Sequence, residues 1–213
     1  MSYFPLFIEL KERRCLVAGG GKIALHKINV LKDFGAQVTV VSPDILPEIK
    51  QMELVECREK KFHASDLDGQ QLVVAATDDK EENHRIAQAC RGKQIPVNAV
   101  DQMEDCSFIF PSYLKKGEVV AAFSSGGQSP LVTQYLKAQM MPLLTDLLAN
   151  LAGRLGDVRE RVQMSCPGEA RKTVYQEILS LGLEKGSVPS DEEIGQIMKK
   201  YGRRQQEAQR WSE

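Results

Sequence analysis

Residues 15–24, Cys-Leu-Val-Ala-Gly-Gly-Gly-Lys-Ile-Ala, join a short apolar run to a helical pattern through a glycine turn. Gly19 permits the tight turn, Gly21 lets the backbone come close to a pyrophosphate, and Ala24 is the small residue where the helix packs on the strand. The helix points free N–H groups and the positive end of its dipole at an anion. The spacing G-x-G-x-x-A therefore predicts a dinucleotide site, to which we assign the whole turn: Gly19, Gly20, Gly21, Lys22, Ile23 and Ala24.

The acidic residue that normally distinguishes NAD from NADP is missing from its usual place. About twenty residues after the glycines, an Asp or Glu would bind the ribose 2′-hydroxyl. The sequence has Ser42 and Pro43 there, with Asp44 next. The Ser42 hydroxyl can bind a ribose or its phosphate, or the residue simply ends the strand before proline. Because no arginine stands beside Ser42, we predict NAD, contacted by Ser42 and Pro43.

A second polar segment follows the apolar run at residues 72–76. Ala-Ala-Thr-Asp-Asp (75–79) would end a strand at the carboxyl edge of the sheet, where ligands bind in doubly wound folds. The small alanines leave room for a ring or a ribose, and we assign Thr77 and Asp78 to the cofactor. Either residue is also a good helix N-cap, and both roles can hold together.

A third strand ends in a carboxylate. Val-Asn-Ala-Val-Asp (97–101) brings Asn98 and Asp101 to the same edge, close to where a nicotinamide and a substrate would meet. A carboxylate there is well placed to take a proton, although most carboxylates that end strands are only solvated. We assign Asp101 as the catalytic base and Asn98 as a cofactor contact that also orients a neighbour or caps the strand.

The polar loop Ser-Ser-Gly-Gly-Gln-Ser-Pro, residues 124–130, lies between a predicted strand and a predicted helix. Such a loop can bind an anionic group at a helix N-terminus, and we assign Ser124, Ser125 and Gly126 to the substrate. Ser129 as N-cap and Pro130 as first helical residue explain the same sequence structurally, and we expect both interpretations to hold.

The elements that position these residues alternate up to about residue 111. Strands are predicted at 15–18, 37–41, 53–56, 72–76 and 96–100, and helices after the glycine turn, at 44–52 and at 80–91. The alternation predicts an α/β protein with a Rossmann-type, mostly parallel sheet. Strands at 108–111 and 118–123 follow, then a helix from 130 that is interrupted at Pro142, and further helices, one of them capped by Ser190 and Glu193. We divide the chain into a NAD-binding domain (1–111), a dimerisation and substrate-cleft region (112–145) and a helical C-terminal domain (146–213).

Composition narrows the class of protein. The chain has 213 residues, 42% of them apolar, and a formal net charge of −1, which is not the polyelectrolyte surface of a non-specific nucleic-acid binder. No apolar run approaches a membrane span, and the N-terminus lacks the apolar core of a signal peptide. The five cysteines are scattered and the three histidines dispersed, so we expect reduced thiols, a cytoplasmic location and no metal site built by the chain.

Taken in order, these segments resemble the precorrin-2 dehydrogenase family, the N-terminal module of siroheme synthase. The residues that carry the resemblance are 4–7 (Phe-Pro-Leu-Phe), 19–24 with Lys27, 35–43, 75–79 with Asn83, 97–101, 107–112 (Ser-Phe-Ile-Phe-Pro-Ser) and 124–130. The resemblance covers roughly residues 3–150. No methyltransferase module follows, so the chain is similar to the stand-alone form of that family.

The resemblance implies oxidation of precorrin-2 to sirohydrochlorin with NAD as hydride acceptor, and in some members ferrous-iron insertion at the same site. It also implies a homodimer formed through the segment after the nucleotide fold. Asp101 matches the family's catalytic carboxylate and Ser125 a serine of the tetrapyrrole cleft. Since the substrate carries eight carboxylates, basic side chains should line that cleft. The candidates are Lys22, Lys115, Lys116 and Lys137.

Two other hypotheses stay open. A non-catalytic dinucleotide sensor would keep the glycine turn without needing a base at Asp101, but such modules usually have the acidic residue that is absent at Ser42. A dehydrogenase of another small acid would normally show a His or Lys near the nicotinamide. His63 and His84 fall in a connecting segment and a helix, which are poor positions for that role.

Overall fold

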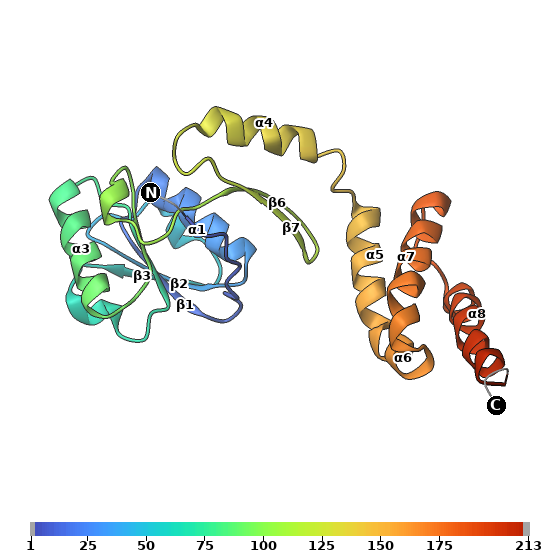
Figure 1. Ribbon diagram of the computed structural model, residues 1–213. Coiled ribbons are helices and arrows are strands. Elements are labelled where there is room, and N and C mark those ends of the chain that lie inside the picture. Colours follow the sequence, from blue (N-terminus) through green and yellow to red (C-terminus); the bar gives the residue numbers. More distant parts are fainter. Residues whose placement is uncertain (1–2, 211–213) are drawn as a thin grey trace. The chain divides into compact units, whose positions relative to one another are not determined.

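The computed structural model describes residues 3–210, with side chains described up to residue 202. The chain divides into two compact units, and the boundary along the chain lies between Phe110 and Pro111 (Figure 1). Among the described residues, no helix is both long enough and apolar enough to cross a membrane.

The first unit is built on a five-stranded sheet of order β3-β2-β1-β4-β5. All four pairings in it are parallel, which confirms the predicted Rossmann-type sheet. The strands are β1 (Arg14–Ala18), β2 (Gln37–Ser42), β3 (Val55–Glu59), β4 (Leu72–Ala75) and β5 (Val97–Ala99).

Helices cover both faces of this sheet, as parallel strands that are apolar throughout require. On one face, Cys15 and Val17 of β1 pack with α1 (Lys22–Asp33) and α2 (Pro47–Lys50). On the other face, Leu16 and Ala18 pack with α3 (Lys80–Gly92). Because all five strands run in the same direction, the polar residues that follow their carboxyl ends are brought to one edge of the sheet.

Strand β3 begins later than the sequence indicated. We predicted residues 53–56, whereas the strand is Val55–Glu59. Leu54 is 88% exposed and has a positive φ of 62°, so it belongs to the turn before the strand. Val55 and Cys57 are half-buried against the core, whereas Glu56 and Glu59 are exposed, as in an edge strand with one face towards the core. The shift makes Glu59 the last residue of β3.

A buried carboxylate anchors the connection from β3 to β4. Asp66, in the 3-10 helix Ala64–Leu67, accepts hydrogen bonds from Lys60 Nζ at 2.6 and 2.8 Å and from the His63 backbone N–H at 2.9 Å. Burial alone would raise the pKa of the Asp66 carboxyl, but these hydrogen bonds outweigh it and hold the pKa below its ordinary value. The carboxylate is therefore part of the folded connection.

The second unit opens with a hairpin of antiparallel strands, β6 (Ser112–Lys116) and β7 (Val119–Phe123), followed by five helices within the described range. The expected strand at 108–111 is wrong. Phe108 and Phe110 instead pack against the core of the first unit beside α1. Two aromatic residues alternating with an aliphatic one fit a strand, but they also fit an extended segment whose rings cover a neighbouring core.

The helices of the second unit are α4 (Pro130–Met140), α5 (Asp146–Asp157), α6 (Arg159–Ser165), α7 (Gly168–Lys185) and α8 (Asp191–Arg210). The interruption at Pro142 and the cap of α4 by Ser129 are confirmed. The Ser190–Glu193 capping box is also present, since Glu193 N donates to Ser190 Oγ and Ser190 N to Glu193 Oε2. The four helices after α4 share a small core built around residues such as Val162, Val174 and Ile194.

Candidate cofactor and catalytic site

A cleft of about 930 Å³ opens at the carboxyl edge of the first unit's sheet. It brings together the ends of β1, β2, β3 and β4, which is where doubly wound folds bind nucleotides. Nine of the predicted cofactor residues line it: Gly19, Gly20, Gly21, Lys22, Ile23, Ser42, Pro43, Thr77 and Asp78.

The three glycines of the turn have different physical roles. Gly19 has a φ of 122°, and an added Cβ would lie 2.6 Å from the Ala76 carbonyl carbon. A Cβ on Gly20 would lie 2.7 Å from Ile45 Cα. Gly21 differs from both, because nothing lies within 4 Å of the Cβ position it leaves empty. The first two glycines allow backbone segments to pack, whereas the third leaves open space in the cleft.

Helix α1 begins at this open space. Its N-cap is Gly21 in an extended conformation, with no side chain capping the helix and no acidic residue in its first turn. The first N–H groups of such a helix suit an anion. Ala24 is fully buried below them, in the helix–strand packing position that the sequence predicted. An empty Cβ position beside an uncapped helix start fits the pyrophosphate of a dinucleotide.

The end of β4 is held by Asn83, whose role the sequence did not indicate. Asn83 is 2% exposed, and its Oδ1 accepts from Thr77 N at 3.0 Å and from Thr77 Oγ1 at 2.8 Å. Its Nδ2 donates to Thr77 O at 3.1 Å. The expectation that Thr77 or Asp78 is the N-cap of α3 is wrong. Asp79 is the cap and accepts from Glu81 N at 2.8 Å. Thr77 is instead hydrogen-bonded to Asn83, and the carboxylate of Asp79 caps the helix.

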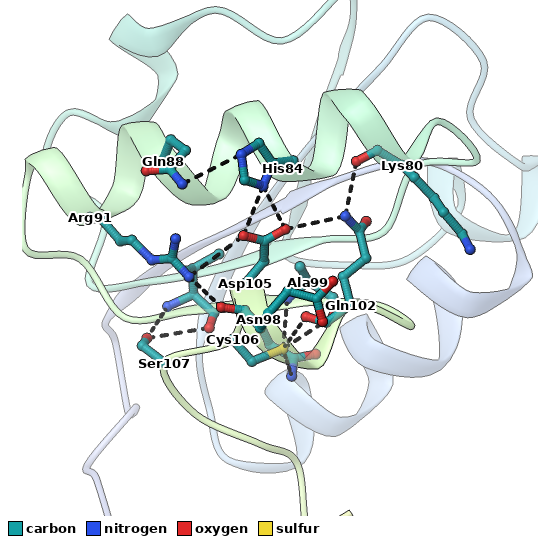
Figure 2. Close-up of polar contacts among 12 residues, drawn as sticks. Lys80, His84, Gln88, Arg91, Asn98, Ala99, Gln102, Asp105, Cys106 and Ser107 are labelled. Atoms are coloured by element: carbon teal, nitrogen blue, oxygen red, sulfur yellow. Dashed lines mark hydrogen bonds and ion pairs between the residues drawn. The ribbon is translucent and has the colours of Figure 1, made fainter. Parts of the chain in front are cut away.

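Asn98 lies in β5 but not among the residues that line the cleft. Its side chain is nearly buried, and Nδ2 donates to Phe108 O at 3.1 Å. The same Nδ2 donates to Cys106 Sγ at 3.5 Å (Figure 2). The amide therefore fastens the chain that returns after β5. Its assignment as a cofactor contact stays a prediction.

The loop after β5 is also fixed to α3 by a buried carboxylate. Asp105 accepts from His84 Nδ1 at 2.8 and 2.9 Å and from Gln102 Nε2 at 3.2 Å, and Arg91 Nη2 lies 3.5 Å away (Figure 2). Because the carboxylate can only accept, we place the proton of His84 on Nδ1. His84 thus joins α3 to the loop after β5, and it is not among the residues that line the cleft.

Asp101 stands at the start of that loop. It is exposed, and its φ of 58° is the left-handed conformation, which is uncommon outside glycine but tolerated by Asp. It does not line the 930 Å³ cleft. Unusual backbone geometry of this kind clusters at functional sites, although by itself it assigns no role.

A lysine on α1 faces the same region. Lys27 is half-buried, and its Nζ lies 4.1 Å from the centre of the Phe110 ring. Burial lowers the pKa of Lys27, while the charges of Cys106 and Asp101 oppose that shift. A cation and a carboxylate are therefore close enough to interact at the end of β5. The sequence did not indicate this position for Lys27, because it depends on contacts between α1 and the segment 108–110.

The predicted substrate residues lie in the second unit. Ser125 Oγ accepts from Ser129 N at 2.9 Å and donates to Ser129 O at 3.1 Å, while Gly126 N donates to Ser124 Oγ at 3.1 Å. These bonds define a compact loop before α4. Gly126 has a φ of 64° and open space around it, as a loop that admits a ligand would need.

Comparison with known proteins gives consistent results. A family model described as "Putative NAD(P)-binding" matches residues 6–112. The chain is 37% identical over 183 residues to a siroheme synthase of Thioalkalivibrio sulfidiphilus, covering 84% of this chain and 37% of that relative. A siroheme synthase of Methylococcus capsulatus is also 37% identical over 183 residues, covering 84% and 39%. This chain therefore spans less than two-fifths of the length of these relatives.

Among solved structures, a protein named SirC, precorrin-2 dehydrogenase, has a TM-score of 0.69 and 23% identity with this chain. The match covers 94% of this chain and all of that one. At this level of identity the likeness concerns the fold, and it extends across both units.

Proposed function

The chain belongs to the NAD(P)-binding family whose model matches residues 6–112, and from that premise we propose that it is an NAD-dependent dehydrogenase of precorrin-2, yielding sirohydrochlorin. The observation that carries the proposal is the carboxylate of Asp101, set in a left-handed turn on the sheet edge that also bears the open position at Gly21. The substrate class comes from the siroheme synthases, which are similar over 84% of this chain.

The division of chemical work follows from the residues. Dehydrogenation removes a hydride and a proton, and bound NAD supplies the acceptor for the hydride. Asp101 takes the proton, because its carboxylate is exposed and accepts no side-chain hydrogen bond within the described part of the chain. Lys27 lies close enough for its charge to interact with that carboxylate. The Asp105 network keeps the loop rigid while the charge on Asp101 changes.

We extend the proposal to ferrous-iron insertion into sirohydrochlorin. The ring nitrogens of a tetrapyrrole ligate the iron themselves, so the chain has only to remove two pyrrole protons, which Asp101 takes one after the other and releases to solvent. In the described part of the chain, no group of three or more His, Cys, Asp or Glu side chains is placed to hold a metal ion. Iron is accordingly a substrate in this proposal.

A homodimer formed through α4 completes the proposal. None of the residues of α4 is buried, and several large apolar side chains on it are exposed: Leu131 (76%), Tyr135 (63%), Val132 (51%) and Leu136 (41%). A helix with this composition has an apolar face that another surface normally covers. We expect the double variant Leu131→Glu/Tyr135→Glu to sediment as a monomer where the parent chain sediments as a dimer. A parent chain that is monomeric at micromolar concentration would refute this part.

The activity is tested anaerobically by mixing protein, NAD and precorrin-2 and following the absorbance of reduced nicotinamide. We expect Asp101→Asn to lower the rate about 10²–10⁴-fold while NAD binds with unchanged affinity. Glu104→Gln is the matched control, since Glu104 is an exposed acid of the same loop. If Asp101→Asn turns over as fast as the parent, Asp101 is not the catalytic base. If the parent binds NAD without turnover, the hypothesis of a non-catalytic dinucleotide sensor is favoured. The same mixture with sirohydrochlorin and ferrous iron tests insertion through the visible spectrum.

A further inference from the structure

We propose that Glu59, at the carboxyl end of β3, supplies the acidic group that β2 lacks and binds the 2′-hydroxyl of the adenosine ribose of NAD. Lys50 holds the Glu59 carboxylate in place. This inference rests on the proposed use of NAD and adds the residue that would select it over NADP.

The register of the sheet places Glu59 beside the expected position. In doubly wound folds the acidic residue at the end of the second strand reads the ribose. Here β2 ends with Ser42, and in the β2–β3 ladder Ser42 is paired directly with Glu59. Neighbouring strands lie about 4.8 Å apart, and paired residues of a parallel ladder point to the same face. The side chain of a glutamate on β3 is long enough for its carboxylate to reach the position beside the end of β2.

The surroundings of Glu59 agree with this role. Glu59 lines the cleft together with Ser42, and 57% of its side chain is exposed, so a ligand can reach it. Its Oε2 accepts from Lys50 Nζ, on α2, at 2.8 Å. One carboxylate oxygen is thus engaged and the other is left to accept from a hydroxyl. Glu56, three residues earlier, lies on the opposite face and bonds Arg58 and Thr39 instead.

Charge then favours a hydroxyl over a phosphate. A ribose hydroxyl donates to a carboxylate, whereas a 2′-phosphate would bring like charge against Glu59. Lys61 also lines the cleft and would attract a phosphate. Lys50 is already paired with Glu59. Asp44 is the other carboxylate near β2. Asp44 also lines the cleft, and its backbone carbonyl packs against Gly20, so its carboxylate is the competing candidate that the experiment must exclude.

The experiment is a ligand cycle measured by calorimetric titration, without catalysis. The two proteins are the parent chain and Glu59→Gln, and the ligands are NAD and NAD lacking the 2′-hydroxyl of its adenosine ribose. We expect Glu59→Gln to weaken NAD about tenfold, the effect of losing a charge-assisted hydrogen bond. The deoxy analogue should bind both proteins within about twofold. NADP should gain relative to NAD by tenfold or more in the variant.

Control variants distinguish a specific hydrogen bond between Glu59 and the ribose hydroxyl from a general effect of negative charge on binding. Glu56→Gln removes the same charge from the opposite face of β3 and Asp44→Asn removes the competing carboxylate, and both should leave the cycle unchanged. Equal weakening of NAD and of the deoxy analogue by Glu59→Gln would overturn the inference, as would a parent chain that prefers NADP. Failure of the parent to bind any of these ligands would instead refute the proposed cofactor. Because Glu59 is largely exposed, we expect its Gln variant to fold, and circular dichroism verifies this.

Discussion

Single Gly→Ala substitutions in the glycine turn should affect the stability of the fold and the affinity for the cofactor separately. Gly20→Ala places a Cβ 2.7 Å from Ile45 Cα, closer than the 3.0 Å below which real Cβ atoms essentially never approach. Since the obstacle is backbone, it can yield only by moving the segment after β2. We expect the free energy of unfolding to fall by about 1–3 kcal/mol, the usual effect of overpacking.

Gly21→Ala should do the opposite. The backbone at Gly21 is extended, with φ −89° and ψ −170°, which alanine adopts without strain, and the methyl group would meet no protein atom within 4 Å. The unfolded chain loses conformational freedom, so stability should rise by about 0.4–1 kcal/mol. The methyl group would, however, stand in the cleft where a pyrophosphate must approach the backbone. We expect NAD affinity to fall by at least about tenfold, or ~1.4 kcal/mol.

Urea unfolding gives the stability of each variant, and calorimetric titration gives its NAD affinity. Gly92→Ala is the matched control: Gly92 also has open space around its Cβ position, but it ends α3 and does not line the cleft. It should leave NAD affinity unchanged. The reasoning fails if Gly21→Ala binds NAD as tightly as the parent, or if it unfolds as easily as Gly20→Ala.

Three further predictions concern buried polar groups. Asn83→Ala removes the three hydrogen bonds to Thr77 and leaves buried backbone groups unpaired, so unfolding free energy should fall by about 2–3 kcal/mol in urea titrations, with weaker NAD binding by calorimetry. Because the pKa of Asp66 is lower in the folded protein than its ordinary value of 3.8, this carboxylate stabilises the fold at any pH above 3.8. That stabilisation is lost as the pH falls through the lower pKa of the folded state. Urea unfolding of Asp66→Asn should therefore show reduced stability at neutral pH and a smaller loss on acidification. Burial raises the pKa of Cys15 to about 11 and of Cys90 to about 12, so mass spectrometry should find both unmodified by iodoacetamide at about pH 8 until the protein is unfolded.

The parallel sheet was predictable because its central strands carry their signal locally. Leu72–Ala75 is apolar at every position and buried on both faces, and so is most of β1. Strand β3 was harder, since at an edge only one face is buried and alternate residues are charged. The apolar pair Leu54–Val55 then drew the predicted strand towards its own N-terminus, although Leu54 lies in a turn.

The same contrast applies to the site. The glycine turn could be identified from sequence because all its functional parts lie within six residues and depend on φ, on the absence of Cβ atoms and on one helix start. Glu59 and Asn83 could not, because their roles depend on which residue of another segment lies beside them. Lys27 depends on Phe110, more than eighty residues away in the chain. Pairings across strands and helices are set by the assembled core, for which a single sequence offers no local signal.

The loop after β5 combines an anchored residue with a free one, and this combination suits a base. Asp105 is almost fully buried and is held by hydrogen bonds from His84 and Gln102, with Arg91 3.5 Å away. Asp101, four residues earlier, is exposed and in a left-handed conformation that costs an L-residue about 1 kcal/mol or more. Glycine would adopt that turn without strain, so folding alone does not explain a carboxylate there. The proposed role as proton acceptor would explain it, because a base must be held at a defined point beside its substrate.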